Sequence, residues 1–384
     1  MFEILTLNKI AKCGLDQLGE NYAITDNEES NPDGIILRSF NMHDMELGSN
    51  LKAVARAGAG TNNIPIEKCT EKGIVVFNTP GANANAVKEA VIAGLILSSR
   101  DVIGGVEWAK ELSGDNVAKQ VEKGKSSFAG TEIKGKTLGV IGLGAIGILV
   151  ANAAYALGMD VIGYDPYLSV DAALKLSRHV KKVNDPKEIF ENSDYITIHV
   201  PFMESTKDTI NAENIAMMKD GVKILNFARN GLVNNDAIKD ALASGKVSSY
   251  VVDFPNEETI NQKGIIAIPH LGASTMESED NCAVMASREI ADYLENGNIE
   301  NSVNFPACSL PVNGVGRVAI LHKNVKNVIA KFTEALSEVN ICDMINKSKN
   351  DVAYTIINTD HEITPDIIEK LNNNDAVIAV RLIK

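Results

Sequence analysis

Short apolar runs alternate with longer segments of helical periodicity over most of residues 1–300. Runs of this kind, bounded by glycine or charged residues, predict β-strands. The predicted strands cover residues 3–7, 34–38, 52–56, 74–77, 137–142, 160–165, 194–200, 222–227, 248–254 and 264–268. Helical segments between them favour βαβ units and parallel sheets. These strands are too many for one mononucleotide-binding half, so the pattern predicts two Rossmann-like, doubly wound α/β domains.

Two long helical patterns divide this α/β block. One covers Ala86–Leu112 and the other covers Glu277–Asn296, where Asn296-Gly297 is a helix stop signal. In a two-domain protein, helices in these positions carry the chain across to a second domain and back. We therefore expect one domain from residues 1–99 and 285–304, a second from residues 100–284, and a cleft between them.

The pattern changes after residue 304. Residues 304–314 are rich in proline, asparagine and glycine and predict a linker. Beyond it the predicted order is strand, helix, strand, strand, helix, strand, over residues 317–321, 324–337, 339–346, 352–357, 365–371 and 376–382. This βαββαβ order predicts a small ferredoxin-like domain over residues 315–384.

Length and charge narrow the class of protein. The chain has 384 residues, 45% of them hydrophobic and 23% charged, which suits a globular protein of two or three domains. Asp and Glu outnumber Lys and Arg by 50 to 37, which gives a formal charge of −13. A binder of nucleic acid or of an anionic membrane needs a basic face, so this balance argues against both classes. An anionic small substrate stays compatible, because a few local cations can make a positive pocket.

Cysteine usage and the N-terminus favour a reducing cytoplasm. The five cysteines, Cys13, Cys69, Cys282, Cys308 and Cys342, lie far apart and form no C-x-x-C pair, which argues against a disulfide framework or a metal site. The first residues lack the basic start and long apolar run of a signal peptide. The stretch Thr137–Met159 carries no charge, but its glycines and its change of period predict a buried strand and helix rather than a membrane span.

A G-x-G-x-x-G pattern lies between the predicted strand at 137–142 and a helical pattern over residues 145–157. In that context the first glycine allows a tight turn, the second allows close approach of a pyrophosphate, and the third allows close packing of helix on strand. The N–H groups at the start of the helix would bind phosphates. The alternative is a glycine turn in an ordinary buried βα unit. The residues expected to contact the cofactor here are Gly142, Gly144, Ala145, Ile146 and Gly147.

Asp165 ends the next predicted strand, as the dinucleotide pattern requires. A carboxylate there accepts hydrogen bonds from the ribose hydroxyls and repels a 2′-phosphate. The following residues, Pro166 and Tyr167, include no arginine. The sequence therefore predicts NAD as cofactor, in preference to NADP.

Arg229, Glu257 and His270 each lie just past the end of a predicted strand. Doubly wound sheets place their sites along that edge, so we expect these side chains to gather there. Arginine is a bidentate partner for a substrate carboxylate, and histidine can take a hydroxyl proton near neutral pH. A neighbouring carboxylate orients the imidazole and favours its charged form. Taken alone, each residue could have a structural role or lie on the surface without a function. Only the combination of the three indicates oxidation of a 2-hydroxy acid.

These motifs resemble the D-isomer-specific 2-hydroxyacid dehydrogenase family. The resemblance covers about residues 1–304 and lies in the segments Arg56–Gly60, Asn78–Gly81, Lys136–Gly144, His199–Pro201 and Pro269–Thr275. It implies a substrate-binding domain in residues 1–99 and 285–304 and an NAD-binding domain in residues 100–284.

The resemblance also implies roles for single residues. Arg229 would bind the substrate carboxylate and polarise the carbonyl, His270 would act as acid and base, and Glu257 would be its partner. Further cofactor contacts would come from Val200, Pro201, Ala228, Asp253 and Gly272. Further substrate contacts would come from Arg56, Gly58, Thr79 and Lys125.

Three positions leave alternatives open. Where the family has Asp-Val-Phe, this chain has Val252-Asp253-Phe254, so the aspartate that meets the nicotinamide carboxamide is displaced by one place. Two adjacent acids, Glu257 and Glu258, compete for the role of histidine partner, and alignment on the phenylalanine favours Glu257. Lys125 either reaches the substrate, from its own or a partner subunit, or is a solvated residue of a charged turn. Asn230 also follows Arg229 where the family has glycine.

The C-terminal domain resembles an ACT domain, a module that binds amino acids at subunit interfaces. The resemblance implies L-serine as a possible effector, held by His322, Asn324 and Asn340. ACT domains commonly have Pro-Gly soon after the first of these positions, and this chain has Val325-Lys326 instead. A module that only dimerises is therefore the alternative.

Together these observations predict NAD-dependent oxidation of a phosphorylated D-2-hydroxy acid by a homodimer or homotetramer without a metal. The alternatives are a related reductase of glyoxylate or hydroxypyruvate, and an NAD-sensing scaffold without catalysis. Arg56, Lys125 and Arg229 favour a phosphorylated substrate, because an unphosphorylated acid needs fewer cations.

Overall fold

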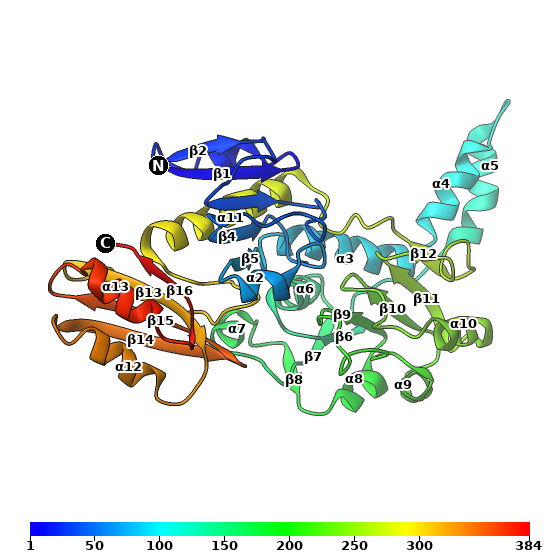
Figure 1. Cartoon of the computed structure of the whole chain (residues 1–384). Helices are drawn as coiled ribbons and strands as arrows, with labels where there is room; N and C mark the ends of the chain where they lie inside the picture. The colour runs from blue at the N-terminus through cyan, green and yellow to red at the C-terminus, as the bar shows by residue number, and fades with distance from the viewer. The chain divides into compact units, whose positions relative to one another are not determined.

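The computed structural model describes residues 1–384 and divides into two compact units. One unit consists of Met1–Asn83 with Met276–Lys384, and the other of Ala84–Thr275. We call them the discontinuous unit and the central unit and describe each by itself (Figure 1).

The central unit is built on a seven-stranded parallel sheet in the order β12-β11-β10-β9-β6-β7-β8. The strands are β6 (Thr137–Ile141), β7 (Asp160–Tyr164), β8 (Lys181–Val183), β9 (Tyr195–Ile198), β10 (Val222–Asn226), β11 (Val247–Val252) and β12 (Ile265–Ala267). The first strand of this unit along the chain, β6, lies in the middle of the sheet. The strands that follow extend the sheet first to β8 at one edge and then to β12 at the other. The strand order therefore reverses between β6 and β9, and the crevice at such a point is where doubly wound sheets bind ligands.

Helices cover both faces of this sheet, and each face has its own buried cluster. One cluster includes residues of α3 and α6, and the other includes residues of α8, α9 and α10. The helices are α3 (Ala84–Ser99), α6 (Ala145–Ala156), α7 (Val170–Lys175), α8 (Pro186–Asn192), α9 (Ala212–Met217) and α10 (Asn235–Ser244). Neighbouring strand residues alternate between the clusters: Val140 belongs to the first and Ile141 to the second. This alternation explains why the central strands are apolar throughout.

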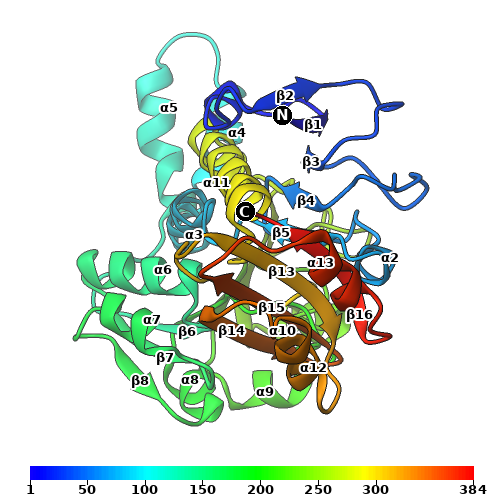
Figure 2. The same ribbon diagram turned by 60° about the vertical axis from the view of Figure 1, so that its left-hand side comes forward.

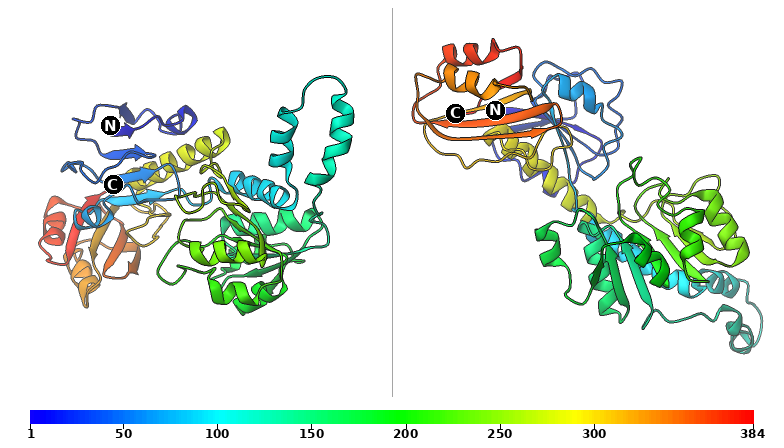
Figure 3. Two further views of the ribbon diagram at one scale, coloured as in Figure 1. Left: turned by 90° about the vertical axis from the view of Figure 1, so that its right-hand side faces the viewer. Right: turned by 90° about the horizontal axis from the view of Figure 1, so that it is seen from below.

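A helical arm projects from the central unit (Figure 3). It consists of α4 (Val102–Lys110), α5 (Val117–Gly124) and the 3₁₀ turn η1 (Lys125–Phe128). Neither α4 nor α5 contains a buried residue, and the ring of Trp108 packs on Phe128. The arm was not expected from the sequence, which predicted one helix over Ala86–Leu112. Asp101 divides that helix, because its side chain accepts a hydrogen bond from the Gly104 N–H and begins a new helix.

The discontinuous unit contains a five-stranded parallel sheet in the order β2-β1-β3-β4-β5. Its elements are β1 (Phe2–Leu7), α1 (Lys12–Leu15), β2 (Tyr22–Thr25), β3 (Gly34–Leu37), β4 (Ala53–Arg56), α2 (Ile66–Glu71), β5 (Val75–Asn78) and the long helix α11 (Met276–Asn296). Residues of α11 share a buried cluster with one face of the sheet, where Ile4 and Ile36 lie. The other face has a second cluster that contains Leu5 and Ile35.

The C-terminal segment forms a four-stranded antiparallel sheet in the order β14-β15-β13-β16 (Figure 2). Its elements are β13 (Gly316–Lys323), α12 (Val328–Ala335), β14 (Ile341–Lys349), β15 (Val352–Thr359), α13 (Pro365–Asn372) and β16 (Val377–Leu382). One face of this sheet shares a cluster with α12 and α13. The other face contributes Leu321 and Tyr354 to the cluster that contains α11, so this sheet packs as part of the discontinuous unit.

The predicted linker over residues 304–314 is packed rather than free. Phe305 is fully buried, and Cys308 pairs with Ile299 in a short antiparallel bridge. The guanidinium of Arg317 in β13 donates to the carbonyls of Leu310 and Pro311. These contacts fix the C-terminal sheet to the chain that follows α11.

All ten predicted strands of the α/β block and the predicted βαββαβ order are present in the structure. The short strands β2 and β8 were not predicted. The two units are divided at residues 83/84 and 275/276, whereas the sequence suggested domain boundaries after residues 99 and 284. The reason is that α3 packs on β10 and β11 within the central unit, while α11 packs on α1 and β4 within the discontinuous unit. None of the helices combines the length with the apolar composition that a membrane span requires.

Candidate active site

The glycine loop after β6 has the geometry that the sequence predicts. Gly142 has a φ of +93°, and a Cβ there would lie 2.6 Å from the carbonyl oxygen of His199. A Cβ at Gly147 would lie 1.9 Å from the carbonyl oxygen of Gly142, so neither position admits a side chain. A Cβ at Gly144 would meet nothing within 4 Å, which leaves open space beside the start of α6.

That open space suits a dinucleotide pyrophosphate. The first N–H groups of a helix have no partner within it, and here they belong to Ala145, Ile146 and Gly147. The helix dipole adds partial positive charge at the same place. The residues present therefore fit the phosphate part of NAD.

Asp165 ties the end of β7 to the glycine loop. Its Oδ2 accepts a hydrogen bond of 2.8 Å from the Leu143 N–H, and its Oδ1 accepts one of 2.8 Å from the Tyr167 N–H. A carboxylate oxygen can accept more than one hydrogen bond, so capacity for ribose hydroxyls is left. Asp165 thus shapes the loop and presents a negative charge beside it.

The segments after β9 and β10 complete the middle of this edge. Val200 lies beside the glycine loop, since a Cβ at Gly142 would come within 2.9 Å of its Cγ1, and Pro201 follows it. The Nε2 of His199 lies 2.9 Å from Thr197 Oγ1, and burial lowers the pKa of His199 to about 3, which keeps the ring neutral. The Ala228 N–H donates to Asn226 Oδ1, which fixes the turn that precedes Arg229.

Arg229 and His270 meet on one aromatic ring. The guanidinium carbon of Arg229 lies 5.8 Å from the centre of the Phe254 ring, and the His270 ring lies 4.5 Å from it. Both polar side chains are exposed, and Arg229 Nη1 donates to the carbonyl of Ala228. In the sequence, Phe254 served only to align the motif, and its contacts with Arg229 and His270 were not predicted. The available signal was its position: it is an aromatic residue directly after a predicted strand, between Arg229 and His270 in the chain.

Asp253 anchors the loop that carries His270. It is 2% exposed, its Oδ1 accepts from the Leu271 N–H at 2.8 Å, and its Oδ2 accepts from the Gly272 N–H at 2.9 Å. Burial raises the pKa of the Asp253 carboxyl, and the two N–H groups and the nearby His270 oppose that shift. The backbone of His270 itself is in the left-handed region, with a φ of +54°, which a non-glycine residue adopts only where its surroundings hold it.

The two candidate acids differ in their surroundings. Glu258 Oε2 lies 3.2 Å from Lys239 Nζ in an ion pair, whereas Glu257 is exposed and makes no hydrogen bond or ion pair. Glu257 is therefore the carboxylate that is available to a partner. The structure does not join Glu257 to His270 by a hydrogen bond.

In the discontinuous unit, Arg56, Gly58 and Thr79 come together at the carboxyl ends of β4 and β5. The Thr79 N–H donates to the carbonyl of Gly58. The guanidinium of Arg56 lies beside Gly58, since a Cβ added to Gly58 would be 2.4 Å from Arg56 Nη1. Thr79 is fully buried beside Cys282: burial raises the pKa of the Cys282 thiol, and the Thr79 side chain opposes that shift. Lys125 belongs to the arm of the central unit, where it is exposed and paired with Glu122.

The three effector candidates are not brought together by a contact. His322 is 1% exposed; its Nδ1 lies 2.9 Å from the Lys323 carbonyl and its Nε2 lies 2.9 Å from Thr355 Oγ1. Asn324 donates to the carbonyl of Asn350, and Asn340 donates to Asp360. Each side chain is thus already engaged within the C-terminal sheet, and effector binding stays a prediction.

A doubly wound parallel sheet with a phosphate-binding glycine loop and an acid at the next strand end defines a dinucleotide-binding α/β protein. Residues 106–274 match the family model described as D-isomer specific 2-hydroxyacid dehydrogenase, NAD binding domain. The chain belongs to this family, and these residues are its NAD-binding domain.

Individual relatives agree with this assignment. The chain is 31% identical over 356 residues to D-3-phosphoglycerate dehydrogenase of Haemophilus influenzae, an alignment that covers 88% of this chain and 83% of that protein. It is 40% identical over 244 residues to a hydroxypyruvate reductase of Thermotoga maritima, covering 61% and 75% of the two chains. The crystal structure of NAD⁺-bound 3-phosphoglycerate dehydrogenase from Entamoeba histolytica matches with a TM-score of 0.61 and 26% identity, over 79% of this chain and 98% of the other.

The chain is shorter than some of its relatives. It spans 51% and 60% of the length of two further curated phosphoglycerate dehydrogenases that it matches at 35% and 33% identity.

Proposed function

We propose that this protein catalyses the NAD-dependent oxidation of D-3-phosphoglycerate to 3-phosphohydroxypyruvate, the first step of L-serine biosynthesis. The observation that carries the proposal is the meeting of Arg229 and His270 on the Phe254 ring, at the sheet edge that also holds the glycine loop. The names of the relatives give the substrate, since the Haemophilus influenzae protein, of which this chain covers 83%, is a D-3-phosphoglycerate dehydrogenase.

The proposed chemistry assigns one task to each side chain. Arg229 binds the substrate carboxylate through its planar, bidentate donors. His270 takes the proton of the 2-hydroxyl group as the C–O bond becomes a carbonyl. NAD, held by the glycine loop and Asp165, would supply the acceptor for the hydride that leaves the same carbon. Glu257, whose carboxylate has no other partner, stabilises the resulting imidazolium. Asp253 and Phe254 hold the histidine loop in place.

The phosphate group needs a second positive region. We assign this task to Arg56, with Gly58 and Thr79 beside it, because Arg56 supplies a guanidinium at the carboxyl end of β4. Lys125 is a further candidate, and its exposed ion pair with Glu122 is weak enough to exchange for a phosphate.

The alternative substrate is an unphosphorylated 2-keto acid, because the Thermotoga maritima relative is named hydroxypyruvate reductase. The decisive assay measures NADH formation from D-3-phosphoglycerate and NADH consumption with 3-phosphohydroxypyruvate, hydroxypyruvate and glyoxylate. The proposal requires a higher kcat/KM for the phosphorylated pair. Preference for hydroxypyruvate or glyoxylate would replace the substrate and keep the hydride chemistry, and no turnover with any of them would favour an NAD-sensing scaffold.

We also propose a homodimer or homotetramer in a reducing cytoplasm. The arm supports the oligomer, since Val102, Ile103, Val106 and Val117 are between 41% and 49% exposed on it and suit burial against a second copy. All five cysteines are free, which agrees with a reducing compartment. Light scattering of the wild type and of a Val106→Glu variant tests the oligomer, with a smaller species expected for the variant.

L-serine is the proposed effector of the C-terminal sheet. Binding through His322 would require its present partner Thr355 to be exchanged for the ligand. Adding L-serine to the assay tests this, and unchanged rates at saturating L-serine would leave the sheet with a structural role only.

A further inference from the structure

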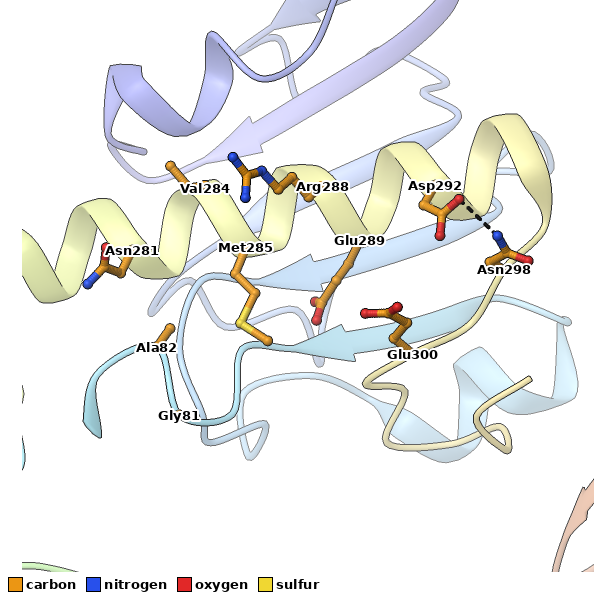
Figure 4. Close-up of a pocket in the computed structure, with 10 residues that line it drawn as sticks. All are labelled: Gly81, Ala82, Asn281, Val284, Met285, Arg288, Glu289, Asp292, Asn298 and Glu300. Atoms are coloured by element: carbon orange, nitrogen blue, oxygen red, sulfur yellow. Dashed lines mark hydrogen bonds between the residues drawn. The ribbon is translucent and has the colours of Figure 1, made fainter. Parts of the chain in front are cut away.

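The discontinuous unit contains a pocket whose residues have none of the catalytic, cofactor or substrate roles proposed above (Figure 4). Its volume is about 610 Å³, within the range of small-molecule sites. One wall is formed by residues of α11, and the other walls come from Gly81-Ala82 and from the chain around Glu300. All of these residues belong to one unit, so the pocket exists within it.

Glu289 is the unusual residue of this pocket. It lies in the interior of α11 and is 7% exposed. Its Oε1 accepts a hydrogen bond from Asn301 Nδ2, but its Oε2 is buried and has no partner. A buried polar atom without a hydrogen bond is unfavourable, so the pocket holds an oxygen that a ligand with an N–H donor would satisfy.

The ionisable side chain that faces Glu289 across the pocket is also acidic. Figure 4 shows the carboxyl groups of Glu289 and Glu300 turned toward each other, with Met285 beside them. Burial, with a contribution from Glu300, raises the pKa of Glu289 to about 8, and Asn301 opposes this. The remaining acid of the pocket, Asp292, is already bound by the side-chain amides of Asn296 and Asn298.

No basic side chain neutralises this pair. Arg288 also borders the pocket, but its Nε and Nη2 donate to Gln17, and its guanidinium points away from the two glutamates in Figure 4. The chain contains no group of three or more His, Cys, Asp or Glu side chains arranged to hold a metal ion. Two carboxyls, an unpaired oxygen and an adjacent thioether instead suit an organic cation with N–H donors and a short apolar stem.

We infer that this pocket binds a small organic cation, a primary ammonium or a guanidinium, between Glu289 Oε2 and the Glu300 carboxylate. The apolar part of the ligand lies on Met285 and Ala82. Because Gly81 and Ala82 closely follow Thr79, a predicted substrate contact, an occupied pocket restrains the chain at that position.

Calorimetric titration of the full chain tests the inference without reference to turnover. The two probes are methylguanidinium chloride and methylammonium chloride, each compared with sodium chloride at the same ionic strength. We expect saturable binding of at least one probe, at least 10-fold tighter at about pH 9 than at about pH 6.5, because the Glu289 carboxyl becomes anionic over that range. The tighter probe shows which cationic group the pocket prefers.

Matched variants locate the binding. Glu289→Gln and Glu300→Gln should each weaken binding by roughly 10-fold or more, the loss of one charge-assisted hydrogen bond. Glu71→Gln, an exposed acid of α2 outside the pocket, makes the same change of charge and should leave binding unaltered. If Glu289→Gln does not fold, Glu300→Gln decides, because that side chain is exposed. Absence of saturable binding by the wild type, or binding by both pocket variants as tight as that of the wild type, overturns the inference.

Discussion

The loops at the carboxyl edge of the seven-stranded sheet and the C-terminal antiparallel sheet contain the same kinds of side chain in opposite settings. In the first, His270 is exposed, and its ring packs on Phe254. In the second, His322 is buried, both ring nitrogens have partners, and the ring packs edge-on against Phe332. Residue type alone therefore does not separate a reactive histidine from a structural one; burial and the number of partners do.

The arginines repeat the contrast. Arg229 is exposed, and its one hydrogen bond goes to the neighbouring backbone. Arg317 has no exposed surface and donates to five acceptors without an acidic partner among them: the carbonyls of Asn296, Leu310 and Pro311 and the side chains of Asn298 and Asn358. A side chain with unused donors can bind a substrate, while one whose donors are all engaged holds the fold together.

The largest expected effect is on catalysis at His270. His270→Ala should lower kcat by roughly 10²–10⁴-fold, the usual contribution of a general acid–base group. NAD binding, followed by protein fluorescence or calorimetry, should be retained, since the glycine loop and Asp165 are untouched. If NAD binding disappears together with turnover, His270 has a structural role and the contrast with His322 fails.

The matched pair Arg317→Leu and Arg229→Leu tests the contrast between the arginines. Arg317→Leu leaves several buried acceptors without donors and should cost about 3–5 kcal/mol, or roughly 6–20 °C in the melting temperature of the discontinuous unit. Arg229→Leu should change stability by less than about 0.5 kcal/mol and abolish most turnover. Thermal melts followed by circular dichroism, with NADH assays below the transition, separate the two effects. A stable Arg317→Leu protein would show that these hydrogen bonds are dispensable.

The sheet edges were predictable because their signals are local. An apolar run followed by glycine or charge marks a strand end, and parallel strands bring such ends to one edge, so Gly142, Asp165, Arg229 and His270 could be grouped from the sequence. The NAD-binding family is confirmed by the match over residues 106–274. The break at Asp101 and the polar three-residue strand β8 were missed, because a single capping side chain or a short edge strand changes the apolar pattern very little.

The surroundings of single side chains were not predictable, because the partners come from distant segments. Asp253 looked like a displaced cofactor ligand, yet its two oxygens accept from Leu271 and Gly272, which follow another strand. His322 looked like an effector ligand, and its partner Thr355 lies on a different strand of the sheet. Local spacing identifies which residues reach a sheet edge, but not which of them are already hydrogen-bonded there.

Asp165→Ala should give an intermediate effect. We expect the KM for NAD to rise by roughly 10-fold and the preference for NAD over NADP to decrease. The reason is that the change removes both the hydrogen-bond acceptor for the ribose and the negative charge that repels a 2′-phosphate. Asp165→Asn keeps an acceptor for the Leu143 N–H, so it controls for loosening of the glycine loop. An unchanged ratio of the two cofactors in both variants would mean that the ribose is read by other residues.

Asp253→Asn distinguishes two roles for this buried acid. Asparagine has one acceptor oxygen, so one of the two N–H groups at Leu271 and Gly272 loses its partner. If Asp253 positions the histidine loop, kcat should fall by about 10-fold while the KM for NAD changes little. A rise in the KM for NAD at constant kcat would instead support direct contact with the cofactor.

The smallest expected effect concerns pH and His322. Burial lowers the pKa of His322, although its contacts with Lys323 and Asn346 oppose the shift, so the folded protein keeps the ring neutral where the unfolded chain protonates it. The stabilisation is therefore complete above the usual histidine pKa of about 6.5 and is lost as the pH falls below it, by up to about 1.4 kcal/mol per pH unit. His322→Gln should flatten this acid-side decline in melting temperature, whereas His43→Gln, at an exposed site of the same unit, should not. An identical decline in wild type and His322→Gln would show that His322 protonates in the folded protein, as an accessible histidine does.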